Sequence, residues 1–182
     1  MNEDQFWQII QTAKRAAGDD DEQLELIEAA LQPLELEDIL EFQRIFDRLH
    51  ERSYRADLWG AAHIINGGAT DDGFDYFRGW LIAQGREVFS AALEQPDSLD
   101  ALFKGDTEAD FLGELEGMLT VAEQLWLERT GLDEEDMDEA VGKSVIKLLE
   151  LGDFSAWTGE DGQADASKCK VVYPRLWARF GG

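Results

Sequence analysis

The sequence predicts an all-α protein, a single compact domain folded as an irregular bundle of about seven to nine helices. Three observations support this fold class. Apolar residues recur at intervals of three and four positions, which places them on one face of a helix. No stretch alternates apolar and polar residues for long enough to predict a sheet. The chain has 182 residues, of which 44% are hydrophobic, and such a chain can bury a core without a disulfide.

The first two predicted helices lie at the start of the chain. One covers residues 3–17 and ends at Gly18, and its apolar residues share one helical face. These apolar residues are Phe6, Ile9, Ile10, Ala13 and Ala17. The other helix begins after Asp19–Asp21, which offer a turn and an N-cap, and it ends before Pro33.

The longest predicted helix covers residues 35–55 and should form the backbone of the core. Its apolar stripe consists of Ile39, Phe42, Ile45, Phe46 and Leu49. A short buried helix follows over residues 56–68, and the turn Asn66-Gly67-Gly68 breaks it.

Two further helices follow that turn. The first begins at Asp71 or Asp72, whose carboxylate can cap free backbone amides, and it ends at Gly85. Gly79 inside this helix predicts a close contact with a neighbouring backbone. Residues 86–93 form the second helix.

The later part of the chain is less regular. Residues 99–103 are predicted to form a further turn, and residues 111–130 a clear amphipathic helix. Residues 133–136 are interpreted as an acidic connector, residues 141–149 as a helix, and residues 153–164 as irregular.

The last predicted element is a short apolar segment over residues 171–180, and we expect it to dock on the core. Its apolar side chains are Tyr173, Leu176, Trp177 and Phe180.

The charge of the chain limits its partners. Asp and Glu number 40 against 16 Lys and Arg, which gives a formal net charge of -24. Such a charge repels a nucleic-acid backbone and an anionic membrane, so we expect no direct binding to either. Basic proteins, cations and small ligands remain the favoured partners. Solubility in an acidic proteome is the alternative explanation of the charge.

Cysteine usage and the first residues favour a cytoplasmic protein. Cys169 is the only cysteine and cannot form an internal disulfide, which fits a reducing compartment. The start of the chain lacks the basic and apolar regions of a secretion signal. The neighbouring Lys168 and Lys170 favour a lowered thiol pKa, so a nucleophilic role for Cys169 stands beside a structural one.

Residues 57–86 read DLWGAAHIINGGATDDGFDYFRGWLIAQGR, and this stretch resembles the bacterial family known as domain of unknown function 4240. The resemblance covers residues 4–126, with a further similarity at Pro174–Trp177, and departs between Leu132 and Val172. It implies a bacterial, soluble, helical domain and no particular reaction.

The resemblance also suggests how the single domain of residues 1–182 is organised. Residues 1–130 would form the helical core typical of the family, and residues 131–182 a divergent helical extension that docks on this core.

One polar constellation is the candidate ligand or interaction site. Its members are Asn66, Asp71, Asp72, Asp75, Arg78 and Arg86, together with Trp157. Carboxylates beside a glycine turn can hold a hard cation or a cationic ligand, although the spacing of a calcium loop is absent. The alternative is structural: Asp71 caps the helix, Asp75 pairs with Arg78, and the glycines turn the chain. Trp157 is expected to be exposed in a glycine-rich loop.

No cofactor and no metal are predicted. The chain contains no phosphate-binding glycine loop, serine nucleophile motif or dinucleotide fingerprint. His50 and His63 lack the paired spacing of a zinc site.

Two functions are therefore open. The leading hypothesis is a protein-interaction module of regulatory or immunity type whose acidic face meets a basic partner, and this favours a protein that is not an enzyme. The alternative is a small-ligand-binding or enzymatic domain that uses the segment from Asn66 to Arg86.

Overall fold

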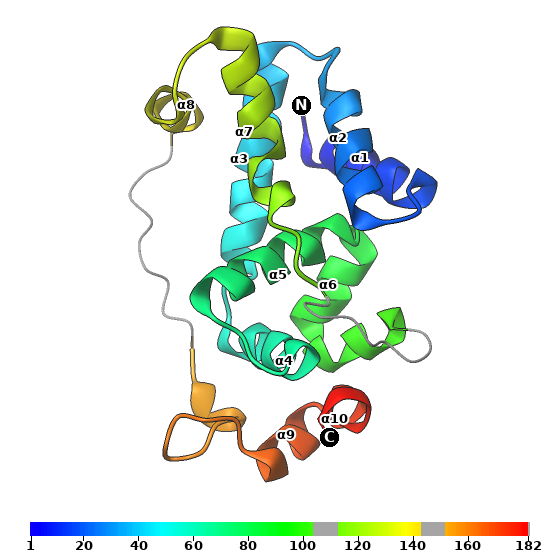
Figure 1. The fold of residues 1–182 in the computed structure, drawn as a ribbon, viewed down its shortest axis with the longest axis vertical. Helices are drawn as coiled ribbons and strands as arrows, with labels where there is room; N and C mark the ends of the chain where they lie inside the picture. Colours follow the sequence, from blue (N-terminus) through cyan, green and yellow to red (C-terminus); the bar gives the residue numbers. More distant parts are fainter. Residues whose placement is uncertain (104–112, 143–151, 182) are drawn as a thin grey trace.

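The computed structural model describes residues 1–103, 113–142 and 152–181, and these residues form an all-α structure (Figure 1). The predicted fold class is confirmed. The described residues contain ten α-helices and two 3₁₀ helices, slightly more than the seven to nine predicted. They contain no strand, and a single isolated bridge pairs Thr158 with Ala164. No helix in the described part of the chain has the length and hydropathy required to cross a membrane.

Helices α1 (Glu3–Ala16) and α2 (Asp20–Leu31) form an antiparallel pair at the start of the chain. A capping box opens α1, in which Asn2 and Gln5 each accept the backbone N–H of the other. Asp19 caps α2 by accepting the N–H of Glu22 at 2.8 Å. Both predicted helices are therefore confirmed, along with the acidic start of the second.

Helix α3 (Leu36–Arg52) is the longest described helix, with 17 residues, as the sequence predicted. It ends three residues earlier than expected. It packs beside α7 (Gly117–Thr130), while α2 lies on one side of this pair and α8 (Glu134–Val141) on the other (Figure 1).

The existence of α8 corrects the interpretation of residues 133–136 as a connector. The carboxylate of Asp133 accepts the N–H of Asp136 at 3.1 Å, and the carboxylate of Asp136 accepts the N–H of Asp133 at 3.3 Å, so the two acids build a capping box. Met137 fixes the helix on the core with 2% exposure. Most of the helix predicted over residues 141–149 lies outside the described residues.

The second half of the fold contains α4 (Ala56–Asn66), α5 (Asp71–Ala83), α6 (Arg86–Glu94) and the 3₁₀ helix η1 (Pro96–Leu102). Helix α5 is central because it contacts α1, α3, α4, α6 and α7. A Cβ atom at Gly79 would lie 3.0 Å from the carbonyl oxygen of Leu115, which lies just before α7. The predicted close backbone contact at Gly79 is therefore confirmed.

The last described segment contains the 3₁₀ helix η2 (Phe154–Ala156), α9 (Ala166–Val172) and α10 (Pro174–Phe180). Helix α10 packs against α4 and η1 at the lower end of Figure 1. Tyr173 and Leu176 are fully buried there. The apolar end of the chain thus completes the same core as α4.

Candidate functional site

The first turn of α5 holds Asp71 and Asp72 at the surface. The side chain of Thr70 accepts the N–H of Gly73 at 3.1 Å, so Thr70 is the N-cap. The expectation that Asp71 or Asp72 provides the cap is wrong, because Asp71 is already the first residue of the helix and Thr70 caps it. The two carboxylates instead lie where the positive end of the helix dipole favours negative charge.

Arg78 is buried at 5% exposure in the middle of α5. Its guanidinium forms an ion pair with Asp75 and donates to the backbone oxygen of His50 at 2.7 Å. The same group lies over the rings of Tyr54 and Phe74, at 4.8 and 5.1 Å from their centroids. The ion pair expected from the spacing of Asp75 and Arg78 is present. Together with His50 of α3, these two residues form a polar centre between α3 and α5.

The contacts of His50 with α5 assign the roles of its two ring nitrogens. Its Nδ1 lies 3.2 Å from a guanidinium nitrogen of Arg78, and its Nε2 lies 3.2 Å from the carbonyl oxygen of Asp75. An arginine can only donate hydrogen bonds, so Nδ1 is the acceptor and Nε2 carries the proton. The imidazole therefore bridges a donor and an acceptor that both belong to α5.

The electrostatics of the centre combine two opposing causes. Burial lowers the pKa of Arg78, while the carboxylate of Asp75 acts to raise it. An arginine remains charged across the physiological range even so. Because this charge is directed at internal acceptors, the centre fixes α5 against α3 and can position neighbouring residues of both helices.

Asn66, the last residue of α4, makes a second polar contact. Its Nδ2 donates to Oε1 of Glu114 at 3.2 Å, and its Oδ1 is buried without a hydrogen-bond partner among the described residues. Burial raises the pKa of Glu114. A Cβ atom at Gly73 would lie 3.1 Å from the same carboxylate oxygen. Sequence reasoning missed Glu114, since a glutamate outside a periodic pattern carries no spacing signal.

Comparison with known proteins places this arrangement in a family. A family model described as a protein of unknown function, DUF4240, matches residues 1–128. The chain belongs to the DUF4240 family. The resemblance seen in residues 57–86 is thereby confirmed. No curated protein and no solved structure matches the chain.

Arg86 lies on a different face of this DUF4240 protein. It begins α6 and pairs with Asp4 of α1 at 2.6 Å, and its guanidinium lies over the ring of Trp7 at 5.9 Å. A shallow groove of about 560 Å³ runs past Arg86 and Arg52. Among the described contacts, Arg86 shares none with the polar centre around Arg78.

Trp157 is buried at 4% exposure, so the prediction of an exposed aromatic residue is wrong. Its indole N–H donates to the backbone oxygen of Ala56 at 2.9 Å. Gly60 leaves the space that the indole and Tyr173 occupy, since a Cβ there would lie 2.9 Å from Nε1 of Trp157. Neighbouring Gly and acidic residues suggested a surface loop, but an indole buries much apolar area once its donor is satisfied.

Cys169 lies outside the residues that the DUF4240 model matches and is fully buried. Burial raises the pKa of its thiol, with a further contribution from Asp165. The lowered pKa expected from Lys168 and Lys170 is therefore wrong. The ammonium of Lys168 instead donates to the backbone oxygens of Ser155 and Thr158, at 2.9 and 2.7 Å.

Metal binding finds no support in the part of the chain that the structure describes. Within residues 1–103, 113–142 and 152–181, no three or more His, Cys, Asp or Glu side chains are grouped to hold an ion. The seven predicted site residues divide among five places: the start of α5, the Arg78–Asp75 ion pair, the Asn66 contact, the surroundings of Arg86, and those of Trp157.

Proposed function

We propose that this DUF4240 protein is an interaction module of regulatory or immunity type, without catalytic activity of its own, that binds a basic protein in the bacterial cytoplasm. The observation that carries the proposal is the uneven distribution of charge over the fold. Residues 1–38 contain eleven acidic and two basic side chains. Helix α8 contains five acidic residues among eight and no basic one. Residues 152–181 contain four of each sign.

The acidic helices α2 and α8 lie on either side of α3 and α7, in the upper part of Figure 1. Their exposed carboxylates include those of Glu25, Glu28, Glu134 and Glu135. A field of one sign concentrated at one end of a molecule steers an oppositely charged partner toward that end. It also repels nucleic-acid phosphates, which supports a protein as the partner.

The test is affinity capture from extracts of the source cell, followed by binding measurements with the purified partner. We call the part of the molecule that contains α2 and α8 the acidic end. Replacing Glu25 and Glu135 by Gln removes two carboxylates from it. Replacing Glu94 and Glu160 by Gln removes two exposed carboxylates elsewhere. We expect the first pair to weaken binding about threefold to tenfold at low salt, and the control pair to change it less than about twofold.

High salt should remove the difference between the two variants, because ions screen exposed charges beyond about 10 Å at 0.1 M. Equal binding of both variants to the captured partner, or capture of no basic protein, would contradict the proposal.

A second function is favoured by one specific observation: Oδ1 of Asn66, beside Glu114, is buried and has no hydrogen-bond partner within residues 1–103, 113–142 and 152–181. We propose as the alternative that a small ligand with a hydrogen-bond donor binds there. A panel of metabolites and nucleotides tests it, since a ligand at 100 times its Kd stabilises the folded state by about 2.7 kcal/mol. The shift should vanish in Asn66→Ala and persist in Arg86→Ala.

A further inference from the structure

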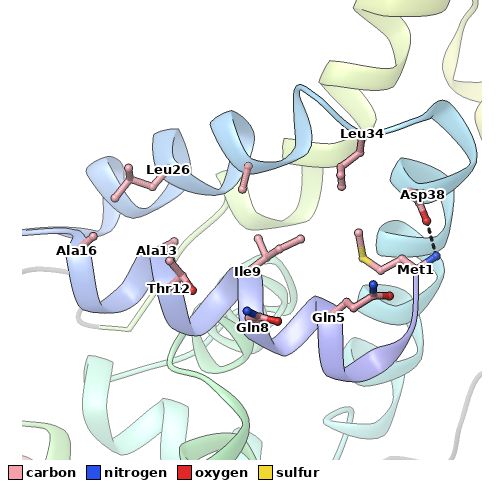
Figure 2. A pocket seen from close by; sticks show the side chains of 11 residues that line it. Met1, Gln5, Gln8, Ile9, Thr12, Ala13, Ala16, Leu26, Leu34 and Asp38 are labelled. Carbon is pink, nitrogen blue, oxygen red and sulfur yellow. Dashed lines mark hydrogen bonds and ion pairs between the residues drawn. The ribbon is translucent and has the colours of Figure 1, made fainter.

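An apolar groove opens between α1 and α2 within the acidic end (Figure 2). Its volume is about 370 Å³, which is within the range of known binding pockets. Ala13 and Ala16 of α1 lie opposite Leu26 of α2 across the groove, and Ile9 lies further along α1 toward Leu34. Apolar side chains from two helices thus line a surface that no described segment covers.

The edges of the groove differ from its floor. Gln5, Gln8 and Thr12 form the edge on α1, and these side chains are polar but uncharged. Asp38 is the one acidic residue of the lining, and it pairs with the terminal ammonium of Met1. The floor is therefore neutral, whereas the chain around it is strongly acidic.

Carboxylates flank the groove on the α2 side. Glu22 and Glu25 are exposed and precede Leu26 on the same helix. Helix α2 has no basic residue in its last turn to offset them. A partner that inserts apolar side chains into the groove would bring its polar flank close to these acids.

We propose that this groove binds an amphipathic helix of the basic partner, with its apolar stripe in the groove and its Lys or Arg residues facing α2. The inference rests on the proposed interaction function and names the site and the partner's chemistry. Helices α1 and α2 have 14 and 12 residues. They are about 18 to 21 Å long, enough for three turns of a docked helix. Docked helices of this kind present anchors at positions i, i+3, i+4 and i+7.

Charge decides between this occupant and a second copy of the chain. Two copies joined at this groove would bring two sets of eleven acidic residues together, and like charges that face each other disfavour association. An acidic peptide is disfavoured for the same reason. A basic helix gains both from burial of its apolar stripe and from attraction to α2.

The probe is a fluorescein-labelled peptide of about 18 residues made of Leu, Ala and Lys, with Leu at helical spacing. Fluorescence anisotropy measures its binding to the full chain. Two control peptides carry Glu in place of Lys, or the same composition in an order that destroys the apolar stripe. We expect the basic amphipathic peptide to bind and both controls to bind at least about tenfold more weakly.

A matched pair of variants locates the binding. Ala30 lines the groove, whereas its neighbour Ala29 is exposed and does not. Ala30→Trp should fill the groove and weaken peptide binding about tenfold or more, while Ala29→Trp should change it less than about twofold. Thr12→Trp obstructs the same groove from an exposed position, so it replaces Ala30→Trp should that variant unfold.

The outcomes separate this inference from the function on which it rests. Equal affinity of the peptide for both tryptophan variants, or no binding to the native chain, overturns the groove. In that case a captured basic protein that still loses affinity on replacement of Glu25 and Glu135 leaves the interaction function intact. Loss of peptide binding in Ala30→Trp alone supports the groove.

Discussion

Asp97 of η1 and Arg175 of α10 form an ion pair across 78 positions of the sequence, with a distance of 2.9 Å between Oδ2 and Nε. Asp97 is only 1% exposed. Its carboxylate also accepts the backbone N–H groups of Arg175 and Leu176, at 3.0 and 2.9 Å. One buried carboxylate therefore satisfies the free amides at the start of α10 and holds the end of the chain against the helical core.

Replacing Asp97 by Ala should lower the free energy of unfolding by about 2–3 kcal/mol, because buried N–H groups lose their acceptor. Asp100→Ala is the matched control, since Asp100 pairs with Arg179 at a more exposed position. That change should cost about 0–1 kcal/mol. Urea denaturation measures both, and equal losses would show that the Asp97 contacts contribute no more than a surface pair.

The two arginines of the candidate site should differ in their effect on stability. Arg78→Met removes a buried guanidinium with several partners and should cost about 2–3 kcal/mol. Arg86→Met removes a half-exposed pair with Asp4 and should cost about 0–1 kcal/mol. Thermal and chemical unfolding of the two variants give the comparison. A larger loss in Arg86→Met would refute the structural role assigned to Arg78.

Glu114 should make stability depend on pH in a defined direction. Its folded pKa is raised above the ordinary value of 4.5, so the folded state holds the proton more tightly than the unfolded state does. Its contribution is therefore favourable at low pH and is lost as pH rises from about 4.5 through the raised folded pKa. Glu114→Gln keeps an acceptor for Asn66 and removes the titration.

The difference in unfolding free energy between Glu114→Gln and the native chain, followed from about pH 4 to pH 8, should shift in favour of the variant as pH rises. A difference that stays constant with pH would mean that Glu114 titrates normally.

Cys169 should be chemically inert in the folded protein. Its thiol is fully buried with a raised pKa, and the thiolate is the reactive form. We expect alkylation by iodoacetamide to be at least about a hundredfold slower in the native protein than in urea. Fast native alkylation with an ordinary thiol pKa would contradict the buried position and restore the nucleophile hypothesis.

The sequence predicted the helices that carry their own signals. Apolar spacing located α1 and α3, and Asp19 and Gly67 marked a start and an end that the structure confirms. Gly67 lies in the left-handed region, with φ of 65°, as its place after a helix suggested.

Long-range contacts could not be predicted in the same way. Nothing in the sequence near Trp157 indicates that its indole reaches Ala56, 101 positions earlier. The pairing of Asn66 with Glu114 likewise joins the end of α4 to the segment before α7, 48 positions later. Local pattern identifies the polar residues, whereas packing of distant helices decides which of them meet.

The packing of Trp157 and Tyr173 against Gly60 has a consequence for the design of truncated variants. The family model matches residues 1–128, yet the surface of α4 at Gly60 is shaped to receive Trp157 and Tyr173 from beyond that match. A fragment limited to the matched residues would leave the space beside Gly60 and the carboxylate of Asp97 open to water. We therefore expect residues 152–181 to stabilise the matched residues, and truncations should be designed to keep them.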